Sequence, residues 1–148
     1  MITEKGYSLV RQFEGLRTLA YKCPAGIRTI GYGHTLNVKA GQVITKAQAD
    51  ELLHADLSKC DAAISRLVTV SLKQHERDAL ASFIFNVGVN AFQSSTMLRK
   101  INADDMQGAA NEFLRWNKAT DPNTRKLVAL NGLTKRREAE KQLFEGKA

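Results

Sequence analysis

A disulfide framework, a membrane span and an export signal are all lacking in this sequence of 148 residues. Its two cysteines, Cys23 and Cys60, are too few to staple a small secreted protein, so we expect two free thiols in a reducing cytosol. No stretch approaches the roughly eighteen apolar residues of a spanning helix, which predicts no stable membrane insertion. No apolar run follows the first basic residues, and we therefore expect no signal peptide.

Metal ligands at paired spacings are lacking as well. The histidines and cysteines show no spacing that is typical of a metal site, so we expect no metal and no other cofactor. Two of the histidines, His54 and His75, fall in helical patterns and are expected at the surface.

Acidic residues are outnumbered, with 15 Asp and Glu against 22 Lys and Arg, which gives a net charge of +7. A diffuse positive surface favours polyanions in general, among them nucleic acids, anionic lipids and cell-wall polymers. The only tight basic cluster is Lys135-Arg136-Arg137, which we expect to be solvated and free to meet carboxylates of a cell wall. The chain has neither a groove-sized basic patch nor a nucleic-acid-binding motif, so no nucleic-acid partner is predicted.

Apolar residues recur at helical spacing over most of the chain, and with 43% hydrophobic and 25% charged residues they predict one soluble domain. Thr45 and Gln48 form a capping-box pattern that opens a helix over residues 45–67. Its length of about 33 Å suits a helix that connects two lobes, about 1–60 and 61–148. Further helices are predicted over 3–13 with Thr3 as N-cap, 71–87 with Ser71 as N-cap, 94–101, 104–116 and 133–145, with a short helical turn within 124–131.

The stretch from Glu14 to Thr35 differs from the helical remainder. Pro24 and Gly26 mark a turn between two short segments rich in aromatic and β-branched residues, which predicts an antiparallel hairpin. The whole chain is therefore expected to be an α+β protein, mostly helical, with one small N-terminal sheet. The hairpin would bring Cys23 and Thr29 together. If the helix that ends at Glu14 packs beside it, a carboxyl, a thiol and a hydroxyl share one cleft.

This stretch closely resembles the phage-type lysozymes of glycoside hydrolase family 24. The matching residues are Glu14-Gly15, Tyr21, Gly26 and Thr29-Ile30-Gly31-Tyr32-Gly33-His34-Thr35, with later blocks at Phe85-Asn86-Val87-Gly88, Gly132-Leu133 and Arg136-Arg137-Glu138. The resemblance implies a lysozyme-like fold. It also implies a catalytic triad at the spacing of Glu14, Cys23 and Thr29, although many members of the family have aspartate where this chain has Cys23.

The resemblance implies a role for each site residue. Glu14 would donate the proton to the leaving oxygen, in an apolar setting that disfavours its charged form. Thr29 would hold the attacking water. Cys23 stays open between a thiolate that acts as base or nucleophile, a thiol that only lines the pocket, and the mark of an inactive relic. His34 would tie strand to loop, and Phe85 would either contact a sugar or belong to the core.

The function implied by the resemblance is that of a muramidase. Such an enzyme hydrolyses the β-1,4 bond between N-acetylmuramic acid and N-acetylglucosamine in bacterial peptidoglycan, and acts in host lysis by a phage or prophage. We expect a monomer that waits in the host cytoplasm until a membrane-opening partner releases it to the wall. The alternative is a relic of the same fold that binds peptidoglycan but has lost hydrolysis through Cys23.

Overall fold

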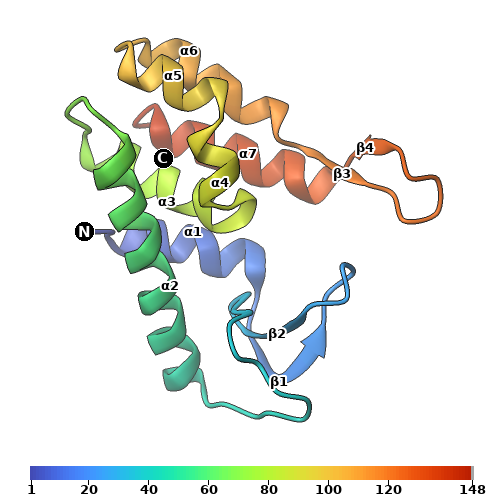
Figure 1. The fold of residues 1–148 in the computed structure, drawn as a ribbon. Helices are drawn as coiled ribbons and strands as arrows, with labels where there is room; N and C mark the ends of the chain where they lie inside the picture. The colour runs from blue at the N-terminus through green and yellow to red at the C-terminus, as the bar shows by residue number, and fades with distance from the viewer. Residues whose placement is uncertain (148) are drawn as a thin grey trace.

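The computed structural model describes residues 1–147. Helices make up most of this part of the chain, and two small antiparallel sheets project from them (Figure 1). The elements are α1 Glu4–Glu14, β1 Arg17–Lys22, β2 Arg28–Gly31, α2 Lys46–Leu67, α3 Gln74–Val87, α4 Val89–Gln93, α5 Thr96–Asn102, α6 Met106–Glu112, the 3-10 helix η1 Phe113–Arg115, β3 Lys118–Thr120, β4 Leu127–Ala129 and α7 Asn131–Phe144.

The N-terminal hairpin has the predicted position and topology. Helix α1 ends at Glu14 because Gly15, at φ 69°, adopts a conformation that favours glycine and turns the chain away. Strands β1 and β2 pair antiparallel, and Tyr21 lies opposite Thr29. The turn between them is closed by the backbone N–H of Cys23, which donates to the carbonyl of Ile27 at 2.9 Å. Cys23 and Thr29 are therefore held at one end of the ladder.

The predicted connecting helix is α2. Its capping box is formed as expected: the Gln48 N–H donates to the Thr45 hydroxyl at 3.1 Å, and the Thr45 N–H donates to the Gln48 side chain at 2.9 Å. One end of α2 packs against β2 and the other against α3, so the helix joins the hairpin region to the helical remainder (Figure 1). The division into lobes at about residue 60 stays a prediction.

Replacing Thr45 with alanine is expected to lower the free energy of unfolding by about 1 kcal/mol, because the Gln48 N–H at the start of α2 loses the hydroxyl that caps it. Chemical denaturation of both proteins measures the difference. Thr69→Ala is the control, since Thr69 is exposed and its side chain caps no helix. Equal stability of the two variants would contradict the assigned cap.

Helix α1 is fixed on α3 in a way that the sequence pattern did not show. Thr3 lies at the N-cap position, but its hydroxyl donates to the Asp78 carboxylate and does not cap α1. The Thr3 N–H donates to the same side chain at 2.9 Å. Because Asp78 is buried in α3, these bonds fix α1, and with it Glu14, against the central helix.

One expected helix boundary is wrong, and one short helix was not predicted. Helix α3 begins at Gln74 and not after Ser71, because the Glu76 side chain accepts from the Lys73 N–H at 2.7 Å and sets the start there. The segment after Gly88 forms the short helix α4, which the sequence analysis left unassigned.

A second sheet replaces the helical turn expected within 124–131. Strands β3 and β4 pair antiparallel, with Lys118 opposite Ala129 and Thr120 opposite Leu127. The Asp121 N–H donates to the carbonyl of Lys126 at 2.8 Å and closes the loop. The expectation of a single sheet is therefore wrong, although the α+β class is confirmed.

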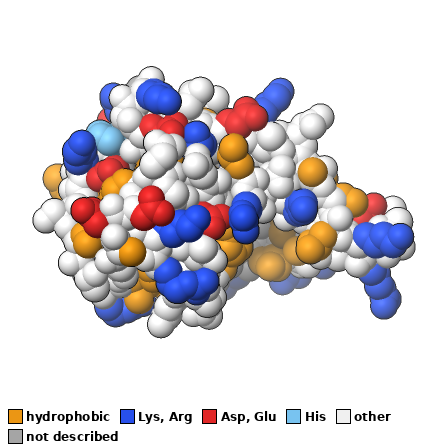
Figure 2. Space-filling model, turned by 90° about the horizontal axis from the view of Figure 1, so that it is seen from above, with side chains coloured by type: hydrophobic (Ala, Val, Ile, Leu, Met, Phe, Trp, Pro, Cys, Tyr) orange, Lys and Arg blue, Asp and Glu red, His pale blue; other side chains and the backbone are white. Residues whose placement is uncertain are grey.

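The core surrounds α3, whose Phe83 makes edge contacts with the rings of Phe92, Phe113 and Trp116 at 5.3 to 6.4 Å between centroids. Cys60 lies on the apolar side of α2 with 6% of its surface exposed, as expected for a core thiol. On the face seen in Figure 2, basic side chains are interspersed with acidic and apolar ones. Within residues 1–147 no helix is long and apolar enough to span a membrane.

Candidate active site

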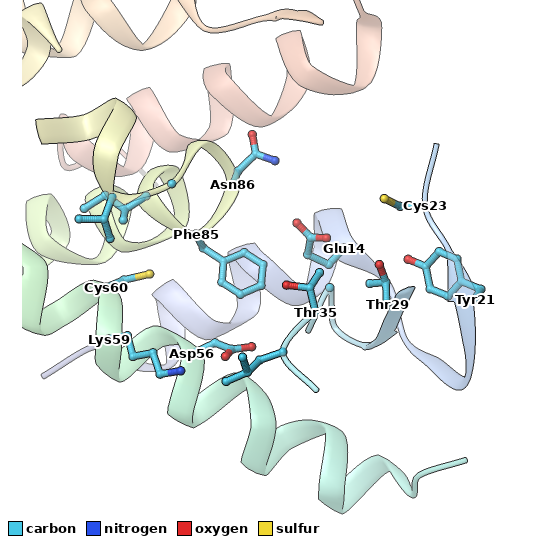
Figure 3. Close-up of a pocket in the computed structure, with 15 residues that line it drawn as sticks. Glu14, Tyr21, Cys23, Thr29, Thr35, Asp56, Lys59, Cys60, Phe85 and Asn86 are labelled. Atoms are coloured by element: carbon cyan, nitrogen blue, oxygen red, sulfur yellow. The ribbon is translucent and has the colours of Figure 1, made fainter. Parts of the chain in front are cut away.

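A cleft of about 530 Å³ opens between the hairpin, α2 and the end of α3. Glu14, Cys23 and Thr29 all line it, together with Phe85 and Asn86 from α3 (Figure 3). The sequence analysis thus selected residues that the fold brings together. Helix α2 adds Asp56, Lys59 and Cys60 to the wall on the other side of the cleft.

The Glu14 carboxylate is held by an arginine at one oxygen and packs against the backbone of Gly33 with the other. Its Oε2 accepts from Nη1 of Arg136 in α7 at 2.5 Å, and its side chain is 21% exposed. Its Oε1 lies over Gly33, where an added Cβ would come within 2.5 Å of that oxygen. The purely apolar setting expected for Glu14 is therefore wrong, because a guanidinium group is its nearest polar partner.

The basic cluster Lys135-Arg136-Arg137 is not a solvated run. Lys135 is exposed, but the side chains of Arg136 and Arg137 are only 4% and 0% exposed, so the expected contact with wall carboxylates is wrong for both arginines. Both pair with Glu140 in the same helix, at spacings of four and three residues. This i, i+4 and i, i+3 pattern is visible in the sequence and could have marked them as buried partners.

Arg137 extends this network to the cleft. Its guanidinium lies 5.0 Å from the centroid of the Phe83 ring and donates to the amide oxygen of Asn86. Burial lowers the pKa of Arg137 to about 10, against the opposing charge of Glu140. The sequence analysis quoted Asn86 only within a family block and gave it no role.

The Cys23 thiol sits in a turn that favours its ionised form. Hydrogen bonding to the backbone of Ile27 lowers the pKa of Cys23 below its usual value, and the backbone of Ala25 acts in the same direction. Thr29 is buried, and its hydroxyl donates to the carbonyl of Ile27 at 3.0 Å.

The second thiol of the cleft has the opposite character. Burial raises the pKa of Cys60 to about 12, and the nearby carboxylates of Asp56 and Asp61 add to the rise. Cys60 therefore stays a thiol at physiological pH. Only Cys23 has the surroundings of a reactive cysteine.

His34 connects the loop after β2 to α2. One ring nitrogen lies 2.8 Å from Asp56 Oδ2, and the other lies 2.9 Å from the carbonyl of Leu36. This geometry is consistent with the structural role expected for His34, which stays a prediction. Of the other two histidines, His54 is exposed as expected, whereas His75 is half-buried and bonds to carbonyl oxygens at the end of α7.

Metal ligands are not clustered at the cleft or elsewhere in the described residues. Within residues 1–147, no three His, Cys, Asp or Glu side chains are placed to hold a metal ion together.

Comparison with known proteins agrees with the geometry. The family model described as phage lysozyme matches residues 11–140. The endolysin of Acyrthosiphon pisum secondary endosymbiont phage 1 is 46% identical over 97% of both chains. The endolysin of Bacillus phage B103 is 44% identical over 97% of this chain, which spans only 53% of that longer protein. The structure of the endolysin from Escherichia coli O157:H7 phage FAHEc1 superimposes with a TM-score of 0.91 at 38% identity, over 100% of this chain and 95% of that one. On this family match and these identities, the chain belongs to the phage lysozyme family.

Proposed function

We propose that this chain is a muramidase that hydrolyses the β-1,4 bond between N-acetylmuramic acid and N-acetylglucosamine in peptidoglycan, with Glu14 as its proton donor. The observation that carries the proposal is the placement of Glu14, Cys23 and Thr29 in one cleft, in a chain of this family. Glycoside hydrolysis needs one group to protonate the leaving oxygen and a second to support attack at the sugar carbon. The Glu14 carboxyl and the Cys23 thiolate are candidates for these two roles.

Thr29 is suited to orient the attacking water. Its hydroxyl proton is already donated to the carbonyl of Ile27, so the hydroxyl oxygen is left to accept a hydrogen bond. A water that donates to this oxygen turns a lone pair toward the sugar. As the water attacks, its second proton passes to the Cys23 thiolate, and Glu14 gives its own proton to the oxygen that leaves.

Phe85 would contact the sugar through its ring. The side chain is half-buried on the wall of the cleft, and an added Cβ at Gly33 would come within 3.3 Å of its ring. Figure 3 shows the ring beside Glu14. An apolar face of this kind suits the CH groups of a sugar.

The decisive experiment is digestion of purified peptidoglycan with analysis of the new reducing ends. Release of N-acetylmuramic acid ends supports the muramidase. Inversion at the anomeric carbon supports water attack with Cys23 as base, and retention supports Cys23 as nucleophile. Wall binding without new reducing ends would support the binding relic instead.

Cys23→Ser is expected to lose about tenfold or more in kcat, because a hydroxyl stays neutral at pH 7 and cannot replace a thiolate. Cys23→Asp is the matched variant, and it should keep substantial activity because a carboxylate restores the negative charge. A small alkylating reagent should inactivate the wild type and spare Cys23→Asp. A Cys23→Ser enzyme with more than about half the wild-type rate, a loss below about 0.4 kcal/mol, would show that the thiol only lines the pocket.

The route to the wall is also part of the proposal. The enzyme would collect in the host cytoplasm and reach peptidoglycan once a partner opens the membrane. Expression in a bacterial host, with and without an agent that permeabilises the inner membrane, tests this. Lysis without the agent would contradict the need for a partner.

A further inference from the structure

Behind the cleft wall, four charged side chains from α1 and α7 form a buried group, named here the Glu140 cluster: Glu14, Arg136, Arg137 and Glu140. Glu140 is at its centre, with its side chain 0% exposed. Its Oε2 lies 3.2 Å from Nε of Arg136, and its Oε1 lies 3.0 Å from Nη1 of Arg137. Arg136 in turn reaches Glu14 at 2.5 Å.

Glu140 is itself fixed from α3. The Ser82 hydroxyl donates to its Oε2 at 2.5 Å, and Nη2 of Arg136 donates to the backbone carbonyl of Ser82 at 3.2 Å. The carboxylate of Glu140 therefore links both guanidinium groups to Ser82 in α3. Small movements of Glu140 would be passed to both arginines.

Each arginine ends on a polar group of the cleft. Arg136 ends on the Glu14 carboxylate, and Arg137 ends on the amide oxygen of Asn86. Because that oxygen accepts from Arg137, the amide nitrogen of Asn86 is the polar group that can donate to a ligand in the cleft. Figure 3 shows this nitrogen on the side of Glu14. One buried carboxylate thus supports two side chains that line the cleft.

The charges of the cluster also depend on Glu140. With both carboxylates ionised, two cations and two anions leave no net charge. When Glu14 takes up the proton that a general acid needs, the cluster carries +1. Without the charge of Glu140, the same protonation would raise it from +1 to +2, in surroundings that screen charge poorly.

From these contacts, we propose that Glu140 is a positioning residue of the enzyme: it holds Arg136 and Arg137 so that Glu14 and Asn86 are aligned, and its charge lets Glu14 stay protonated beside Arg136. The inference rests on the proposed role of Glu14 as proton donor. Glu140 does not line the cleft and acts only through the two arginines.

Few charged or titratable groups face the carboxylates of Glu140 and Glu14. Burial raises the pKa of Glu140, and Arg137, Arg136 and the Ser82 hydroxyl oppose this rise. Glu14 is faced by Arg136 from α7, with Arg137 behind it, and by the Cys23 thiol across the cleft. An effect of Glu140 on Glu14 should therefore appear in the pH dependence of activity.

The test is the pH dependence of kcat/KM for release of reducing ends by the wild type, Glu140→Gln and Glu138→Gln. In Glu140→Gln, the pH profile should move by about one unit to lower pH, because the uncompensated arginines disfavour the protonated form of Glu14. Its kcat should also fall. Glu138→Gln removes the same charge from an exposed position of the same helix and should leave the profile unchanged.

Ser82→Ala keeps Glu140 but removes the hydroxyl that stabilises its charge. The pH profile of this variant should move in the same direction by a smaller amount. If Glu140→Gln does not fold, the Ser82→Ala profile tests the inference in its place. An unshifted pH profile in a folded variant overturns the inference, even where kcat falls, because a merely structural role lowers kcat alone. A wild type that releases no reducing ends would defeat the proposed function as well, and so the two failures are distinguishable.

Discussion

Replacing Glu14 with glutamine is expected to lower the rate of peptidoglycan hydrolysis by roughly 10² to 10⁴, because the amide has no proton to give to the leaving oxygen. The amide oxygen can still accept from Arg136, and the side chain keeps its size. The fold should therefore survive. Release of reducing ends from purified wall, measured beside the thermal midpoint, checks both parts.

Glu4→Gln is the matched control for this experiment. Glu4 lies on the same helix as Glu14, and its side chain is 74% exposed and paired with Arg11 at the surface. It should retain the wild-type rate. A folded Glu14→Gln protein that hydrolyses wall as fast as Glu4→Gln would end the assignment of Glu14 as the acid.

Gly33→Ala is expected to lower kcat by roughly 10², since a displacement of about 1 Å in a reacting group is enough for such a loss. The new Cβ would lie 2.5 Å from Glu14 Oε1 and 3.0 Å from its carboxyl carbon. Arg136 holds the other oxygen, so the carboxylate cannot yield without breaking that bond. Steady-state kinetics on soluble wall fragments gives the measurement.

Gly41→Ala separates this effect from backbone strain. Gly41 has the same φ of 75° as Gly33, but nothing lies within 4 Å of an added Cβ. Both variants should lose about 1–2 kcal/mol of stability, as expected for alanine in a left-handed conformation. Equal activity of the two variants would show that Gly33 has no special relation to Glu14.

The sequence was most informative where structure is decided locally. Thr45 and Gln48 mark the start of α2 because both halves of a capping box lie within four residues. The hairpin was predictable for a similar reason, since turn residues stand between two strand-forming segments. The start of α3 was missed because Lys73 is an uncommon residue at an N-cap, and the Glu76 side chain that fixes it follows three residues later.

Long-range partners account for most of what the sequence analysis missed. Arg136 is 122 residues away from Glu14, and no local pattern links them. The β3–β4 hairpin was missed because its strands have only three residues each, with the basic loop of Arg125 and Lys126 between them. Glu140 carried a readable signal in its spacing from the two arginines, but a run of charges on a helix more often faces water.

The separation between Glu14 and Arg136 has a consequence for protein synthesis. Helix α1 leaves the ribosome first, and α7 leaves it last. At translation rates of about 5–20 residues per second, the 122 residues between the two partners take roughly 6–24 s to make. During that time the nascent chain carries Glu14 without the arginine that bonds to it. Assembly of the proposed catalytic centre is therefore coupled to the synthesis of α7, and a fragment that stops before α7 contains Glu14, Cys23 and Thr29 but not Arg136.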